Sequence, residues 1–157
     1  MTLVISLKRG RNGQDSLACR RNDGTATWRR LQPGFASHDL RHFAVESTLG
    51  VDSAFYGLIA RGWNLEDFGA PWPKGRLPEE AAWVECTIAA IWSDRDHPAL
   101  RSTEEINSAI REMQRGASFE RRLTSDEIRA IRECFDEQIE RWRRLDRGEV
   151  MELEVLV

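Results

Sequence analysis

Two histidines stand four positions apart near the start of a predicted helix. His38 and His42 close the string His38-Asp39-Leu40-Arg41-His42, and residues four apart on a helix project from the same face. One helical turn, ~6 Å of rise, would separate their Cα atoms. Both imidazoles could then reach one ion, as in the H-E-x-x-H helix of zinc enzymes. The pair predicts a bound divalent metal, for which zinc, iron and manganese are the candidates.

Glu46 lies one further turn along the same helical face. It is eight positions from His38, so ~12 Å of rise separates the two residues, whereas metal–ligand bonds are only ~2 Å long. We therefore expect Glu46 either to orient a histidine ligand or to bind a metal together with His42 alone. Asp39 is rotated roughly 100° away from the pair and is expected to interact with the helix dipole.

A further ligand is predicted from a different helix. Glu85 is the only charged residue in the apolar run 81–92. A buried carboxylate without a partner costs several kcal/mol, so this group should be paired, protonated or bound to a cation. Helical bundles build metal sites from such acids and from histidines on facing helices. A buried ion pair with Arg41 or Arg61 is the alternative that the sequence leaves open.

The string from His38 to His42 resembles the H-D-x-x-H metal motif of the ubiquinone-biosynthesis scaffold family. That family is largely helical and is associated with zinc and with lipid-like quinone intermediates. Its motif continues with eleven residues and then a glutamate, and the corresponding position here is Ala54. The resemblance covers five residues and implies a metal at His38 and His42. In its general character the sequence also resembles small bacterial proteins.

The elements that must position these residues include strands at both ends of the chain. Apolar and polar residues alternate over 3–8 and again over 151–157, which is the period of a half-buried strand. Asn22-Asp23-Gly24 predicts a hairpin turn between two further strands, since glycine tolerates positive φ. The last strand needs a partner for its backbone groups, and the N-terminal hairpins supply it. We expect one small antiparallel sheet.

About five helices are expected between the hairpins and the last strand. The predicted residues at their starts are, in order, Ser37, Asp52, Pro78, Ser102 and Thr124. The last helix carries a single apolar stripe at 3–4 spacing, formed by Ile128, Ile131, Phe135, Ile139 and Trp142. Strands followed by helices and a closing strand predict one α+β domain over residues 1–157.

Residues 63–77 form a long predicted loop that contains three bulky aromatic residues. Loops of this length are either functional covers or segments that pin their own side chains onto the core. Glu66 and Asp67 in this loop are weaker candidates for metal ligands. The third histidine, His97, lies in a predicted connector over 94–98 and is expected to be an ordinary loop residue.

Composition narrows the function further. The 157 residues carry 26 acidic and 23 basic side chains, a formal charge of −3, which argues against a nucleic-acid-binding protein. The chain has no stretch of ~20 apolar residues, so no membrane span is predicted. Its three cysteines form no C-x-x-C pair, and its start lacks the features of an export signal. Free thiols without such a signal favour the reducing cytoplasm.

Three functional hypotheses follow from the sequence. The first is a metal-dependent protein that uses His38, His42 and either Glu85 or Glu46, with a substrate and reaction that the sequence does not specify. The second is a non-catalytic interaction module that could form a homodimer, because six tryptophans are residues enriched at interfaces. The third is nucleic-acid binding through a basic hairpin patch beside Trp28, composed of Arg20, Arg21, Arg29 and Arg30.

Overall fold

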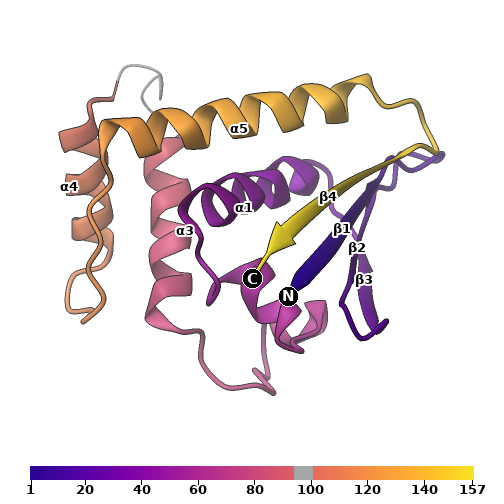
Figure 1. Ribbon diagram of the computed structural model, residues 1–157, viewed down its shortest axis with the longest axis horizontal. Coiled ribbons are helices and arrows are strands. Elements are labelled where there is room, and N and C mark those ends of the chain that lie inside the picture. The colour runs from indigo at the N-terminus through magenta and orange to yellow at the C-terminus, as the bar shows by residue number, and fades with distance from the viewer. Residues whose placement is uncertain (94–100) are drawn as a thin grey trace.

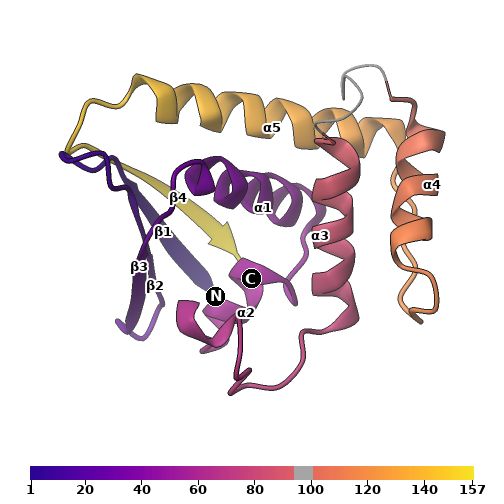
Figure 2. The ribbon, with the colours of Figure 1, turned by 180° about the vertical axis from the view of Figure 1, so that it is seen from behind.

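The computed structural model describes residues 1–93 and 101–157. Four antiparallel strands form one sheet in the order β3-β2-β1-β4, and the helices lie on one side of it (Figures 1 and 2). The strands are β1 (Thr2–Lys8), β2 (Ser16–Arg20), β3 (Ala26–Arg30) and β4 (Val150–Leu156). The predicted α+β arrangement, in which N-terminal hairpins and a C-terminal strand share one sheet, is confirmed.

Local sequence explains how the sheet forms. The β2–β3 turn has Gly24 at a φ of 85°, and Asp23 Oδ1 accepts a hydrogen bond from the Thr25 amide at 2.9 Å. Strand β4 pairs with β1 along its whole length. The first and last residues are also joined, since the Met1 amino group lies 2.6 Å from the Val157 carbonyl oxygen. The two ends of the chain therefore lie side by side (Figure 1).

The helical region contains five α-helices and one 3₁₀ turn among the described residues. The elements are α1 (Phe35–Leu49), α2 (Phe55–Ala60), the 3₁₀ turn η1 (Leu65–Asp67), α3 (Glu79–Ile91), α4 (Thr103–Met113) and α5 (Ser125–Arg144). The predicted starts at Ser102 and Thr124 are confirmed. Each residue is the N-cap of its helix and forms a capping box with the glutamate three positions later, Glu105 in α4 and Glu127 in α5.

Two predicted helix starts are wrong. Ser37 lies inside α1, which begins at Phe35 directly after Gly34. The N-cap is Gly34, whose φ of 83° lets the chain turn from the sheet into the helix three residues earlier than the predicted cap at Ser37. Asp52 does not cap α2, which begins three residues later at Phe55. Its carboxylate instead pairs with Arg61 at 2.5 Å.

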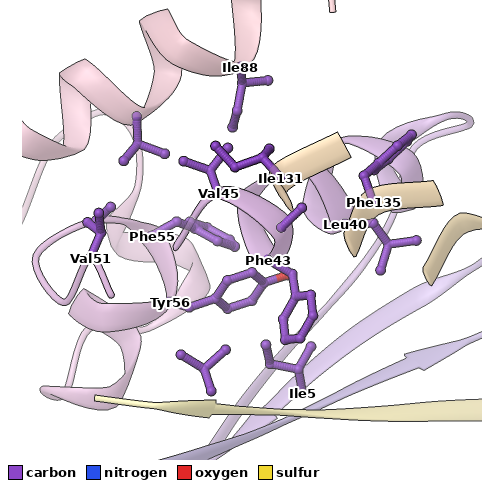
Figure 3. Close-up of a cluster of buried hydrophobic side chains, with 14 of the residues drawn as sticks. Ile5, Leu40, Phe43, Val45, Val51, Phe55, Tyr56, Ile88, Ile131 and Phe135 are labelled. Carbon is purple, nitrogen blue, oxygen red and sulfur yellow. The ribbon is translucent and has the colours of Figure 1, made fainter. Parts of the chain in front are cut away.

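Helix α1 lies between the sheet and α5 and is the centre of the fold (Figures 1 and 2). Its apolar side chains meet those of the inner sheet face, and Figure 3 shows Phe43 and Ile5 pointing toward one another between the two layers. The predicted apolar stripe of α5 is buried from Ile128 to Trp142. The site histidines therefore stand on a helix that is covered on two sides.

Some predicted features have a simple outcome. The three cysteines are free, and of these only Cys19 is buried. The connector at 94–98, with His97, lies outside the described residues. Within residues 1–93 and 101–157, no helix is both long enough and apolar enough to cross a membrane.

The packing of α5 on α1 leads to a stability prediction. Ile131 is fully buried in the core, so Ile131→Ala should lower the free energy of unfolding by about 2–5 kcal/mol through lost burial and the cavity left behind. Glu133→Ala, at an exposed position on the same helix, should change it by less than about 0.5 kcal/mol. Urea denaturation of both variants measures the difference, and equal effects would contradict this packing.

Candidate metal centre

The two histidines of α1 and Glu85 of α3 come together at the interface of these helices. One ring nitrogen from each of His38 and His42 and one carboxylate oxygen of Glu85 all lie within 4.8 Å of one another. The two imidazole rings are 4.8 Å apart between centroids and nearly perpendicular. The structure thus brings together three of the four residues predicted as ligands.

His42 is buried between two carboxylates. Its Nδ1 atom lies 3.2 Å from Glu46 Oε1, and its Nε2 atom lies 3.1 Å from Glu85 Oε1. Both contacts need a proton on the ring nitrogen, because an ionised carboxylate only accepts hydrogen bonds. His42 therefore bridges α1 and α3 as a doubly hydrogen-bonded imidazolium.

Glu46 does not belong to the three-residue cluster, because both of its carboxylate oxygens have other partners. Its Oε2 atom accepts hydrogen bonds from the backbone amides of Tyr56 at 2.8 Å and Gly57 at 3.3 Å. Glu46 therefore orients His42 and satisfies the first amides of α2, which is the orienting role expected from its spacing. Gly57 is required in this contact because a Cβ atom there would lie 2.1 Å from the Asp52 carbonyl oxygen.

The expected burial of Glu85 is wrong. Its side chain is 50% exposed. Glu85 lies with Ala82 and Ala89 on the exposed side of α3. The sequence does not reveal this side, because the two alanines are apolar residues and read as part of the buried run. The alternative ion pairs with arginine are also absent among the described contacts. Arg41 packs over the rings of Trp92 and Phe135, and Arg61 pairs with Asp52.

Aromatic side chains from α2 and the following loop cover one side of His42. The ring of Phe55 lies 5.1 Å from that of His42, and Phe68 packs on Phe55 at 4.8 Å between centroids. The long loop thus packs Phe68 beside the site, with Trp63 against Phe68, whereas Trp72 is exposed. Glu66 is exposed, and Asp67 caps η1 by accepting a hydrogen bond from the Asn64 amide, so neither belongs to the cluster.

Asp39 is buried. It lies beyond the first turn of α1, which contains no acidic residue, so the expected interaction with the helix dipole is not its main contact. Its Oδ1 atom lies 3.5 Å from the Arg29 guanidinium, whereas its Oδ2 atom has no hydrogen-bond partner in the described part of the chain. Burial raises the pKa of Asp39 to about 6, although Arg29 opposes the shift. The Asp39 carbonyl oxygen accepts a hydrogen bond from the Tyr56 hydroxyl at 3.0 Å.

The predicted basic patch is divided between two faces of the hairpin. Arg21 turns inward and donates to the Ile59 carbonyl oxygen at 2.6 Å and to the Trp63 carbonyl oxygen. Arg29 turns inward over the ring of Phe55. Both arginines therefore hold α2 and its loop against the sheet, and the sequence reading missed this positioning role.

The surroundings of the two histidines shift their pKa values in opposite directions. Burial and the nearby charge of His42 lower the pKa of His38. Burial alone would also lower the pKa of His42, but its hydrogen bonds to Glu46 and Glu85 outweigh that effect and raise it to about 9. Burial opposes a lower pKa at Glu85 too, yet the hydrogen bond from His42 lowers it. Around neutral pH, the protein without metal therefore holds one cationic and one neutral imidazole.

The donor set fits a divalent transition metal. Two atoms that each lie ~2.1 Å from one ion are at most ~4.2 Å apart, so shifts of about an ångström would bring the cluster to bonding distance. The half-exposed Glu85 can supply this movement. Two imidazoles and one carboxylate are ligands that zinc, iron and manganese accept. Comparison of the chain with protein-family models, curated proteins and solved structures finds no significant match.

The pairing of His42 with Glu46 and Glu85 gives a pH prediction that is tested in the presence of a chelator. The folded state keeps this proton up to a pKa of about 9, whereas an unfolded histidine loses it near 6.5. The folded state then binds more protons than the unfolded state, so the free energy of unfolding should fall as pH rises through this interval. Urea denaturation in chelator should show the fall in the wild type and a weaker one in His42→Gln. Parallel curves would refute the pairing.

Proposed function

We propose that this chain is a divalent-metal protein whose ion is bound by His38, His42 and Glu85, with Glu46 orienting His42. The proposal rests on one observation above all. A buried imidazole has Nδ1 fixed by one carboxylate and Nε2 directed at another, with a second imidazole beside it. Metal-binding histidines are usually held this way, by a carboxylate or carbonyl group on the nitrogen that does not bind the ion.

Metal binding would replace the proton between His42 Nε2 and Glu85. His38 supports this exchange because its lowered pKa leaves its imidazole neutral and ready to ligate. Three protein ligands leave at least one coordination position for water or substrate, and the exposure of Glu85 gives solvent access to it. An ion held in this way polarises a carbonyl or phosphoryl oxygen, or lowers the pKa of a bound water for hydrolysis.

Metal content tests the proposal directly. Tag-free protein, purified without chelator, should contain about one zinc, iron or manganese ion per chain by plasma mass spectrometry. His42→Ala should abolish binding, and Glu85→Gln should weaken it at least ~10-fold by chelator competition, because the amide does not supply an anionic ligand. Glu80→Gln, on the same helix but outside the cluster, is the matched control and should bind like the wild type.

The two site variants keep this test decisive. His42 is buried, so its replacement by alanine could unfold the chain, whereas the half-exposed Glu85 tolerates glutamine. Circular dichroism of Glu85→Gln establishes that it is folded. A wild-type protein that binds none of the three metals, or a folded Glu85→Gln that binds as the wild type does, would overturn the proposal.

The orienting role of Glu46 has its own signature. Glu46→Gln keeps an acceptor for the α2 amides but weakens the hold on His42 Nδ1, so metal affinity should fall by about 10- to 100-fold while the ligands stay in place. Chelator competition measures the affinity. The absorption spectrum of the cobalt-substituted variant should match that of the wild type, which would show that the number of ligands is unchanged. Unchanged affinity in a folded Glu46→Gln would remove Glu46 from the metal centre.

A further inference from the structure

Arg41 is a half-buried cation on α1 that lacks a hydrogen-bond acceptor. Within residues 1–93 and 101–157, no carbonyl or carboxylate oxygen accepts from its guanidinium group, and its Nε atom is buried without a partner. Other half-buried arginines each donate to at least one such oxygen, namely Arg9, Arg21, Arg29, Arg101 and Arg121. Buried donors in native proteins are normally paired. The exception at Arg41 therefore indicates an acceptor that the described residues do not supply.

Two aromatic rings hold this guanidinium in place. It lies over Trp92 at 5.6 Å and over Phe135 at 5.8 Å from the ring centroids. The two rings also pack on each other, with 5.0 Å between their centroids. Ring faces attract a cation but are only weak hydrogen-bond acceptors, so the N–H groups of Arg41 keep their capacity to donate. A guanidinium that is already held in one place loses little conformational freedom when it binds an anion.

Arg41 lies next to the candidate metal centre. It is three positions from His38 on α1, a spacing that places the two Cβ atoms ~5–6 Å apart on the same side of the helix. After burial, the positive charge of Arg41 is among the causes that lower the pKa of His38. On α3, Trp92 is two turns, ~10 Å, from Glu85, and the exposed Ala89 lies between them. A small molecule bound at the ion would therefore be within reach of Arg41.

The charges around the cluster favour an anion once a metal is bound. A divalent ion and Arg41 together carry three positive charges, whereas Glu46 and Glu85 together carry two negative charges. Without Arg41 these charges would balance. Because the site is partly buried, water and salt screen the excess positive charge less than they would at an open surface. The metal-loaded site should therefore attract an anionic group.

We propose that the metal centre takes a small organic anion whose phosphate or carboxylate group is bound by Arg41. The inference rests on the proposed function, because it names the class of molecule that reaches the ion. The planar fork of the guanidinium matches the oxygens of both groups. The ion would take the carbonyl or phosphoryl oxygen that is polarised. Arg41 is thus an anion-binding residue beside the three metal ligands.

Packing alone does not account for an arginine at this position. The aliphatic part of an arginine side chain can cover aromatic rings, but a methionine would cover them equally well. A methionine would also avoid the cost of a buried Nε atom without a partner. A ligand for the charge explains why a charged residue stands over the two rings.

Anion binding to the zinc-loaded protein tests the inference. Isothermal titration calorimetry of the wild type should detect inorganic phosphate or acetate, and the tighter of the two identifies the anionic group. Arg41→Met should weaken this binding at least ~10-fold, because it keeps the packing and removes the charged donors. Arg41→Lys keeps the charge without the fork and should be intermediate. Arg111→Gln, at an exposed arginine on α4, is the control and should bind as the wild type does.

Zinc content separates this inference from the proposed function. Each variant should keep the circular dichroism of the wild type and about one zinc ion per chain, because Arg41 is not a metal ligand. If Arg41→Met does not fold, Arg41→Lys is judged by the same criterion. A wild type that holds no zinc overturns the proposed function and the inference together. A zinc-loaded wild type that binds neither anion, or a folded and zinc-loaded Arg41 variant with unchanged anion affinity, overturns the inference alone.

Discussion

A carboxylate removed from water must find a donor for each oxygen, because its burial otherwise costs several kcal/mol. Glu46 meets this constraint with His42 Nδ1 on one oxygen and the amides of Tyr56 and Gly57 on the other. One side chain thereby ties α1 to α2 and fixes the orientation of His42. The direction of Nε2 toward Glu85 follows from that orientation, so the candidate metal centre and the packing of α2 depend on the same buried group.

The surrounding fold keeps this arrangement rigid. Helix α1 is held between the sheet and α5, while Arg21 on the hairpin holds the backbone of α2 and its loop. The Tyr56 hydroxyl of α2 donates a hydrogen bond to the Asp39 carbonyl oxygen of α1. Such second contacts are what keep ligands near a productive geometry. Freedom of movement is concentrated at Glu85, whose side chain reaches the cluster from the exposed stripe of α3.

Local signals in the sequence were sufficient for the elements and for part of the site. The alternation at both ends of the chain gave the strands, the two capping boxes gave the starts of α4 and α5, and the spacing of His38 and His42 gave a shared face. These features depend on neighbouring residues alone, for which helix and strand periods are reliable guides. The choice of Glu85 as their partner also agreed with the structure, although its burial did not.

Other features depend on contacts that spacing does not encode. Asp39 is buried because α2 and β3 meet at that side of α1, and no local pattern specifies this meeting. The inward direction of Arg29 could have been predicted from the sequence. Arg29 is two positions from Thr27 on β3, so both side chains point to the same face of the sheet, where Thr27 is buried. Gly57 inside a predicted helix was a second signal, because a glycine there often marks a close backbone approach.

The central claim is that His42 Nε2, His38 and Glu85 converge on one ion. Crystals of the protein, soaked in zinc and measured on both sides of the zinc absorption edge, test it most directly. The account predicts one anomalous peak between α1 and α3, about 2.0–2.2 Å from each of the three ligands, with Glu46 still on Nδ1. A map without that peak, with the His42–Glu85 hydrogen bond intact at saturating zinc, would contradict it.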